Sequence, residues 1–263
     1  MSRPVVALLT DFGLRDHYAG TMKGVVLGVC PEAVLVDITH DIPAHDVLAG
    51  ALELAASYRY FPGGTVFLVV VDPGVGSPRR AIAAEAGDYR FVAPDNGVLS
   101  AVFKEMPATR IVELTDRRYA RPTVSRTFEG RDRFAPAAGW LAKGVALTAL
   151  GRPTATSQAL DMPTPRPTAD GLSGEVIRVD RFGNLITNID RSAFDGASSS
   201  QIVAVVLGDR VVRVVETYAG ARAGEVCALF GSSDHLEIAI SGESAALKLG
   251  LGRGAVVHIR HGA

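Results

Sequence analysis

Residues 65–80 read TVFLVVVDPGVGSPRR, and this stretch decides the fold of the first half of the chain. The run Thr65–Val71 is short, continuous and apolar, as expected of a strand that is buried on both faces of a parallel sheet. Two glycines and two prolines in the loop that follows, 72–80, predict a tight turn that a ligand can approach closely. Because ligands of α/β sheets bind at the carboxyl ends of the strands, the sequence predicts that this loop forms one wall of a small-molecule site.

The segments around this strand alternate between short apolar runs and stretches of helical periodicity. We expect further strands at Val5–Leu9, Val34–Ile38, Arg90–Ala93 and Arg110–Leu114, and helices at Ala19–Cys30, Val47–Tyr60 and Pro136–Gly144. Alternation of this kind implies a mostly parallel sheet with helices on both faces. Residues 1–152 are therefore predicted to form an α/β domain.

The second part of the chain has a different pattern. Residues 153–171 contain four prolines among many small polar residues and have no periodicity, so we interpret them as an interdomain linker. Residues 172–263 consist of short apolar runs separated by glycine-rich turns. This pattern predicts a smaller all-β domain, built as a barrel or a sandwich.

The bulk composition excludes several classes of protein. The chain has 263 residues, 48% of them hydrophobic and 21% charged, with a formal net charge of −1, which is ordinary for a folded globular protein. It has no polybasic tract, which argues against nucleic acid or anionic lipid as the main partner. No apolar run reaches the roughly 20 residues that a membrane helix needs, and Val5–Leu9 is too short for a signal peptide.

The two cysteines, Cys30 and Cys227, are far apart and belong to no CxxC motif, which favours a reducing cytoplasm. His17, His40 and His45 each lie near an aspartate, so a metal site is a rival interpretation. No HxH or HExxH spacing supports it, however, and we predict neither a metal nor a cofactor.

Polar residues follow several of the predicted strands. Asp11, Asp72 and Asp95 come at strand ends, and Asp37 lies within the second strand. Any one of them could be a helix cap or a turn aspartate. Since the ends of parallel strands meet at one edge of a sheet, their recurrence favours a shared site.

Two charged segments of the first domain are candidates for chemistry. The loop at Asp72 lacks the Gly-Lys-Ser/Thr ending of a nucleoside triphosphate site, and Arg79 could either turn back towards Asp72 or lie on the surface. Residues 127–136 carry Glu129 and further charges between two phenylalanines. They form either a solvated run of charges or a partly buried loop, and the flanking aromatic residues favour the loop.

Two segments of the second domain are suited to hold a ligand. In 179–188, Phe182 could stack on a planar ring and Asn184 could bind the edge of a heterocycle, although a β-bulge is an alternative. In 231–237, two serine hydroxyls and the carboxylate of Glu237 could hold a zwitterion. A simple turn is equally compatible with that segment.

Taken in order along the chain, five motifs resemble those of the S-adenosyl-L-methionine (SAM) hydroxide adenosyltransferase family, whose relatives include fluorinase and chlorinase enzymes. The motifs are Leu8–Gly13, Val71–Gly76, Ala93–Gly97, Gly130–Asp132 and Asp180–Asn184. The resemblance spans nearly the whole chain. It implies an N-terminal α/β domain, a C-terminal barrel-like domain and a homotrimer with active sites between subunits. It also implies hydrolysis of SAM to adenosine and methionine, with SAM as substrate and no cofactor.

The resemblance assigns roles to individual residues. It implies that Asp11 binds the ribose hydroxyls, and that His45 stands where the fluorinase presents a tryptophan to the ligand. Contacts with adenine or the neighbouring part of the ligand are implied for Phe182 and Asn184. Contacts with the methionine end are implied for Asp180, Ser232 and Ser233.

The family hydrolases are thought to use an Asp-Arg-His set around the attacking water. Asp72 and Arg79 match the first two members, but Glu129 stands where the family motif has histidine. The sulfonium leaves as a neutral thioether, so the enzyme needs only a positioned nucleophile, and either carboxylate could take its proton. Two alternatives stay open: a protein that binds SAM without turnover, and a halogenase, which two carboxylates near the nucleophile disfavour.

Overall fold

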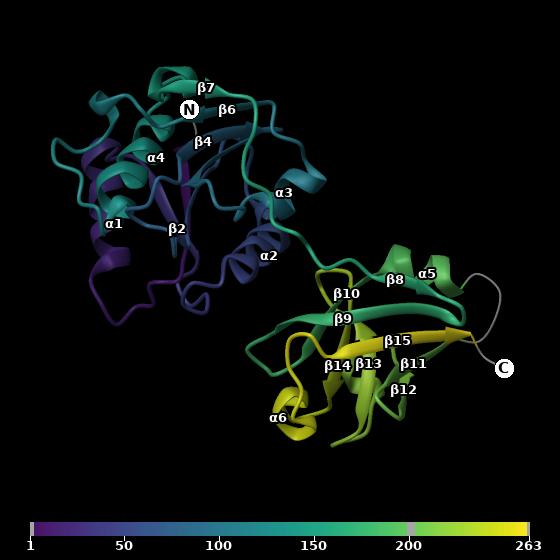
Figure 1. Cartoon of the computed structure of the whole chain (residues 1–263). Coiled ribbons are helices and arrows are strands. Elements are labelled where there is room, and N and C mark those ends of the chain that lie inside the picture. Colours follow the sequence, from purple (N-terminus) through teal and green to yellow (C-terminus); the bar gives the residue numbers. More distant parts are fainter. Residues whose placement is uncertain (1–2, 199–202, 262–263) are drawn as a thin grey trace. The chain divides into compact units, whose positions relative to one another are not determined.

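The computed structural model describes residues 3–198 and 203–261. The chain folds into two compact units, Met1–Asp161 and Met162–Ala263, and the division falls inside the predicted linker. Figure 1 labels the elements of both units. Among the described residues, no helix is both long enough and apolar enough to cross a membrane.

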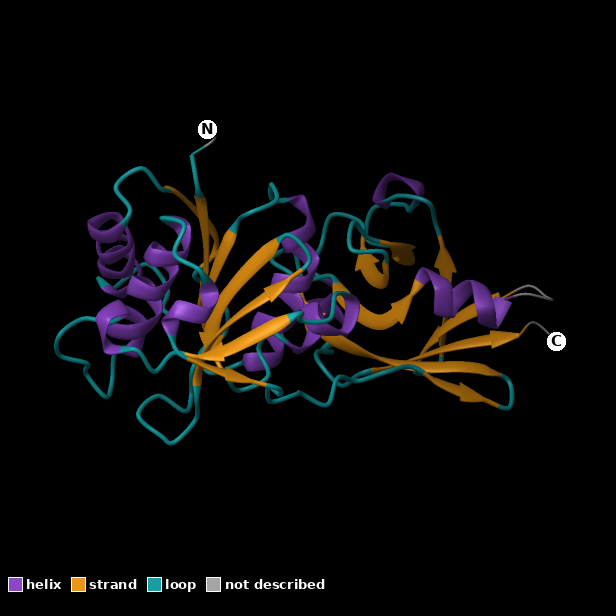
Figure 2. Cartoon of the chain, turned by 90° about the horizontal axis from the view of Figure 1, so that it is seen from above, coloured by secondary structure: helices purple, strands orange, loops and turns teal. Residues whose placement is uncertain are grey.

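The first unit is built on a seven-stranded sheet in the order β2-β1-β3-β5-β4-β6-β7. Figure 2 shows strands in orange and helices in purple. The strands are β1 (Val5–Thr10), β2 (Val34–Thr39), β3 (Val66–Val70), β4 (Ala81–Ala86), β5 (Tyr89–Pro94), β6 (Arg110–Glu113) and β7 (Arg152–Thr154). The pairs β2–β1, β1–β3 and β3–β5 are parallel, whereas β5–β4, β4–β6 and β6–β7 are antiparallel. The α/β class is confirmed, with the parallel strands gathered in one half of the sheet.

Helices cover both faces of this sheet because consecutive strand residues point to opposite sides. Val6 and Leu8 of β1 pack in one core with α1 (Tyr18–Val29) and α4 (Ala135–Ala142). Ala7 and Leu9 pack in a second core with α2 (Val47–Ser57) and α3 (Ser100–Glu105). The central strands are therefore buried on both faces, as the apolar run Thr65–Val71 predicts.

The first half of the predicted linker is fastened to the first unit. Arg80 donates from Nε to Asp95 at 2.7 Å, from Nη1 to the Thr154 hydroxyl at 2.7 Å and from Nη2 to the Thr156 carbonyl at 2.8 Å. The amide of Gln158 donates to the other Asp95 oxygen at 2.7 Å. Residues 154–158 therefore run along the sheet edge rather than as a free tether.

The second unit is a closed barrel. Its strands are β8 (Arg166–Thr168), β9 (Gly171–Val179), β10 (Leu185–Asp190), β11 (Val203–Leu207), β12 (Arg210–Val214), β13 (Val226–Phe230), β14 (His235–Ile240) and β15 (Val256–His261). The order β10-β14-β13-β12-β11-β15-β9 closes because the long strand β9 pairs with β15 through its first half and with β10 through its second half. Two short helices, α5 (Arg191–Ser198) and α6 (Ala245–Leu249), complete the unit. The predicted barrel-like domain is thus confirmed.

Candidate active site

The loop after β3 is held in one conformation by its own backbone and by a neighbour. Asn96 donates from its side-chain amide to the Val71 carbonyl at 2.9 Å, and the amide of Val75 donates to the Asp72 carbonyl at 3.2 Å. Gly76 has φ +79°, and a Cβ there would lie 2.6 Å from the carbonyl oxygen of Arg126. Only glycine fits this position, and the loop is fixed against the segment that leads to Glu129.

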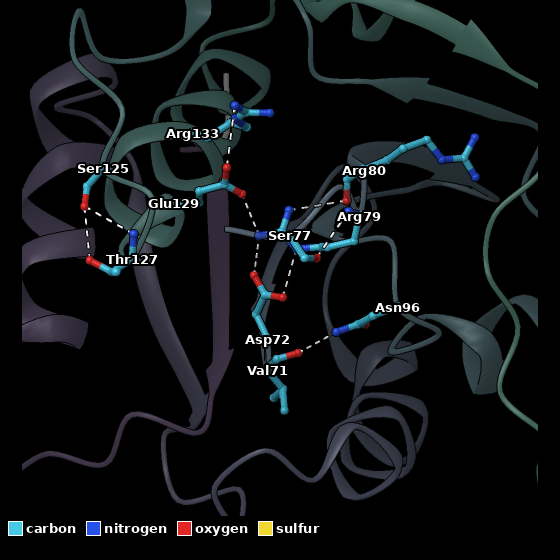
Figure 3. A network of polar contacts seen from close by, with 10 residues as sticks. All are labelled: Val71, Asp72, Ser77, Arg79, Arg80, Asn96, Ser125, Thr127, Glu129 and Arg133. Atoms are coloured by element: carbon cyan, nitrogen blue, oxygen red, sulfur yellow. Dashed lines mark hydrogen bonds and ion pairs between the residues drawn. The ribbon is translucent and has the colours of Figure 1, made fainter. Parts of the chain in front are cut away.

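Arg79 turns back from this loop and joins two carboxylates (Figure 3). Its Nε donates to Asp72 Oδ1 at 2.9 Å, and its Nη2 donates both to Asp72 Oδ2 and, at 2.5 Å, to Glu129 Oε2. The side chains of Asp72, Arg79 and Glu129 are only 5%, 10% and 12% exposed. The interpretation of Arg79 as a surface arginine is therefore wrong, and so is the interpretation of the segment around Glu129 as a solvated run of charges.

Two carboxylates share the Arg79 guanidinium, and the partly exposed Arg133 lies 3.6 Å from the other oxygen of Glu129. Burial raises the pKa of Asp72; the hydrogen bond from Arg79 opposes that rise, and the charge of Glu129 adds to it. Burial pulls the pKa of Arg79 down, but its bonds to Asp72 and Glu129 outweigh burial and keep it above the ordinary value. Asp72 is thus a carboxylate of increased basicity beside a permanent cation.

Glu129 is presented by a π-helical turn, Gly130–Phe134, that leads into α4. Asp132 anchors this turn: it is fully buried, accepts from Nε of Arg131 at 2.7 Å and accepts from the amide of Ser125 at 2.9 Å. Burial acts to raise the pKa of Asp132, but the hydrogen bond from Arg131 and its other donors lower it overall. A π-turn of this kind is found most often at functional sites, and here it aims Glu129 at Arg79.

Asp11 lies beside this group in the sheet, since it directly follows β1 and β1 pairs with β3. Its Oδ2 accepts a hydrogen bond of 2.9 Å from the amide of His45. His45 has φ +69°, a left-handed conformation that is strained for histidine. The rings of Phe12 and Phe128 meet edge to face at 6.0 Å, so the Asp11 loop also packs against the segment that carries Glu129.

A series of hydrogen-bonded side chains, buried at Thr10 and His40 and open to solvent at Asp37, supports the Asp11 loop. The hydroxyl of Thr10 lies 2.8 Å from Nδ1 of His40, and Nε2 of His40 lies 3.0 Å from Asp37, which also accepts from Lys23 at 2.6 Å. His40 is 4% exposed. The structure gives His40 a role in holding this loop, and the described residues contain no group of three or more His, Cys, Asp or Glu side chains that could hold a metal ion.

In the second unit, the predicted ligand residues converge. A cavity of about 850 Å³ is lined by all six of them: Asp180, Phe182, Asn184, Ser232, Ser233 and Glu237. They come from the turn between β9 and β10, from the turn between β13 and β14, and from β14 itself. The eleven predicted site residues therefore form two clusters, with five in the first unit and these six in the second.

Hydrogen bonds fix the polar groups of this cavity. Asp180 accepts from the amides of Phe182 at 2.9 Å and Asn184 at 2.8 Å, and from the Asn184 side chain at 2.9 Å. The amide nitrogen of buried Asn184 is thus engaged, which leaves its oxygen to accept from a ligand. Phe182 is 77% exposed, so one face of its ring is available for stacking.

Among the residues that line the cavity and that the sequence did not predict are Tyr218 and Arg178. Tyr218 donates to Glu237 at 2.7 Å, and burial together with this bond raises the pKa of the phenol. Burial also raises the pKa of Glu237, and the hydrogen bond from Tyr218 offsets only part of that rise. Arg178 could have been found, because it lies near the end of β9 and precedes Asp180, the first residue of the following turn, by two. Tyr218 lies in a loop with no such signal.

The comparisons with known proteins agree across both units. Family models described as the SAM hydroxide adenosyltransferase N-terminal and C-terminal domains match residues 6–151 and 174–258. A Salinispora tropica protein named (R)-S-adenosyl-L-methionine hydrolase is 38% identical over 252 residues, 94% of each chain. A protein of Actinoplanes sp. named fluorinase is 29% identical over 221 residues, 74% of each chain. The crystal structure of an uncharacterized conserved protein from Thermotoga maritima is similar with a TM-score of 0.91 and 35% identity, covering 97% of this chain and 100% of the other.

Proposed function

Because the chain belongs to the SAM hydroxide adenosyltransferase family, we propose that it hydrolyses SAM to adenosine and L-methionine by attack of water at ribose C5′. The observation that carries this proposal is the group formed by Asp72, Arg79 and Glu129, which is almost buried and joins two carboxylates through one guanidinium. Such a group can accept a proton from water while its guanidinium holds the geometry.

The reaction needs no general acid, because the leaving group is neutral. The C5′–S bond breaks as the oxygen of water forms the new C5′–O bond, and the electron pair of the broken bond leaves on sulfur as a neutral thioether. The proton of the attacking water passes to a carboxylate. The enzyme must therefore supply a water in line with the C5′–S bond and shield it from bulk solvent.

Asp72 is the better candidate for the base because its pKa is raised by burial. Glu129 holds Arg79 from the other side through the 2.5 Å bond from Nη2. In this role Glu129 replaces the histidine of the family motif: it keeps the guanidinium in place and adds a second acceptor close to the water.

The remaining residues bind the substrate in this proposal. Asp11 holds the ribose hydroxyls, with His45 beside it. The cavity of about 850 Å³ receives the rest of SAM: Phe182 and Asn184 contact adenine, and Asp180, Ser232, Ser233 and Glu237 contact the methionine end. No group beyond SAM and water enters the reaction.

The active protein is proposed to be a homotrimer with sites between subunits. The division of the predicted site residues between the two units supports this, because one unit carries the proposed water-activating carboxylates and the other carries the ligand cavity. We place the protein in the cytoplasm, in keeping with two cysteines that are both free and buried.

The test is hydrolysis in water enriched in oxygen-18. We expect adenosine and methionine in equal amounts, with the label in the 5′-hydroxyl of adenosine. Methylthioadenosine with labelled homoserine, or S-adenosylhomocysteine with labelled methanol, would contradict attack at C5′. Binding of SAM in calorimetry with no product released would identify a binding protein instead. A chlorinated nucleoside in high chloride would identify a halogenase, an outcome that the negative charge of Asp72 and Glu129 opposes.

A further inference from the structure

The segment 116–133, which leads to and includes Glu129, is rich in arginine. It contains six arginines, and three of them form ion pairs with the two aspartates of the same segment. The pairs are Arg118 with Asp116 at 2.6 Å, and Arg121 and Arg131 with Asp132 at 3.3 and 2.7 Å. The other three arginines are not balanced in this way.

These three are Arg117, Arg126 and Arg133, and all line one cavity of about 510 Å³. Within the described part of the chain, the side chains of Arg117 and Arg126 form no ion pair or hydrogen bond, and Arg133 meets only Glu129, at 3.6 Å. Ser77 and Ser125 add hydroxyl groups to the wall, and Glu129 is the only acid in it. The lining therefore carries three positive charges and one negative charge.

Like charges gathered around a cavity repel one another, and a bound anion removes that repulsion. Planar guanidinium groups match the oxygens of a phosphate group two at a time, and serine hydroxyls donate to the oxygens that remain. A sulfonium or ammonium ion would be repelled, so the cavity does not suit SAM. We propose that this cavity is a binding site for a small oxyanion with two or more negative charges, of the phosphate class.

The site lies next to the proposed reaction centre. Gly76 and Ser77 come from the loop that carries Asp72 and Arg79, and Glu129 is shared: its Oε2 accepts from Arg79 and its Oε1 faces Arg133 (Figure 3). We therefore expect a substitution that removes the charge of Glu129 to have opposite effects on anion binding and on hydrolysis. Removing the charge of Glu129 takes away the only repulsive group in the cavity, whereas it takes an acceptor from the hydrolytic site.

Calorimetry on the full chain at constant ionic strength tests the site, with inorganic phosphate, pyrophosphate and ADP as probes. We expect Arg117→Gln and Arg126→Gln each to weaken pyrophosphate binding about tenfold or more, since a hydrogen bond to a charged group contributes roughly 1.5–3 kcal/mol. Glu129→Gln is expected to strengthen binding. Arg118→Gln is the matched control, because Arg118 lies in the same segment but is paired with Asp116.

The probes also separate the sources of the anion. Tighter binding of ADP than of pyrophosphate would point to a nucleotide, and the reverse order to a free inorganic anion; both support an oxyanion site. The proposal is overturned if wild-type protein binds none of the probes, or if Arg117→Gln and Arg126→Gln bind pyrophosphate as wild type does. Binding is measured without SAM, so loss of the site and loss of the proposed hydrolysis are read separately.

Discussion

Glu129 accepts a hydrogen bond of 2.5 Å from Nη2 of Arg79, the same nitrogen that reaches Asp72. One guanidinium therefore fixes two carboxylates that would otherwise repel each other. Arg133 lies 3.6 Å from the other oxygen of Glu129, so the reactivity that we propose depends on Asp72, whose pKa burial and the charge of Glu129 raise.

Substitution of Asp72 tests the proposed base. We expect Asp72→Asn to lower kcat about 10²–10⁴-fold, the range typical of a lost general base, and to change SAM affinity much less. Release of adenosine followed by chromatography gives the rate, and calorimetry gives the affinity. An unchanged rate would remove the loop after β3 from the mechanism.

Glu129 needs a pair of variants, because the residue both contacts Arg79 and could accept a proton. Glu129→Gln should lower the rate much more than it weakens SAM binding, since the amide cannot take a proton and balances less of the Arg79 charge. Glu129→His restores the residue of the family motif and should retain more activity than Glu129→Gln. Equal turnover by wild type and Glu129→Gln would contradict a role for the carboxylate.

The pH dependence follows from the environment of Asp72, which faces Arg79 and Glu129. Burial raises the pKa of Asp72 above its ordinary 3.8, and only the ionised carboxylate can accept a proton. We therefore expect kcat/KM to fall as pH decreases through a midpoint above 3.8. The Arg79 guanidinium stays charged throughout this range because its bonds to the two carboxylates raise its pKa. Rate profiles of wild type and Asp72→Asn check this: the acidic limb should disappear in the variant.

Much of this arrangement could be predicted from local sequence. The apolar run Thr65–Val71 and the glycines after it indicate a buried strand and a tight loop, because those signals are encoded within a few residues. Strand β4 escaped prediction because Ala81–Ala86 is mostly alanine, which lacks the β-branched pattern of strands, although five of its six residues are buried. Its antiparallel pairing is likewise not visible in composition.

Contacts between distant residues were the hardest to predict. Arg80 reaches Thr154 and Thr156 across more than 70 residues, so a segment that reads as a free linker is in fact held to the sheet. Tyr218 meets Glu237 from a loop that has no periodic pattern. The six residues of the second cavity were predicted because each lies in a compact motif, whereas the partners that hold those motifs come from elsewhere in the chain.

The Arg80 contact is open to a stability test. The Asp95 side chain is only 2% exposed, so Arg80→Gln leaves a buried charge without its partner, which typically costs about 3–5 kcal/mol. Arg80 itself is partly exposed, and we expect the lower end of that range. Denaturant unfolding gives the free energy of unfolding. Arg110→Gln is the control, because its pair with Glu85 is 55% and 25% exposed and should contribute less than about 1 kcal/mol. Similar losses in the two variants would contradict a special role for Arg80.

The last prediction concerns the support of Asp11. Buried Thr10 and His40 are hydrogen-bonded in series with Asp37, whose side chain is 41% exposed, and the Thr10 hydroxyl also accepts from the amide of Phe12, directly after Asp11, at 3.3 Å. Thr10→Val keeps the shape but removes the hydroxyl, which leaves the buried His40 nitrogen unpaired at a cost of about 1–3 kcal/mol.

If these hydrogen-bonded side chains position Asp11 against the ribose, Thr10→Val should raise KM for SAM several-fold while kcat changes little, because Asp72 and Arg79 are untouched. His40→Leu should do the same more strongly, and His40→Asn, which can still bond Thr10, should recover part of the affinity. His17→Asn is the matched control, since His17 is an exposed histidine directly before α1 whose ring, within the described residues, has a hydrogen bond with Thr21 alone. A fall in kcat at constant KM would show that Thr10 and His40 help to position the attacking water rather than the ribose.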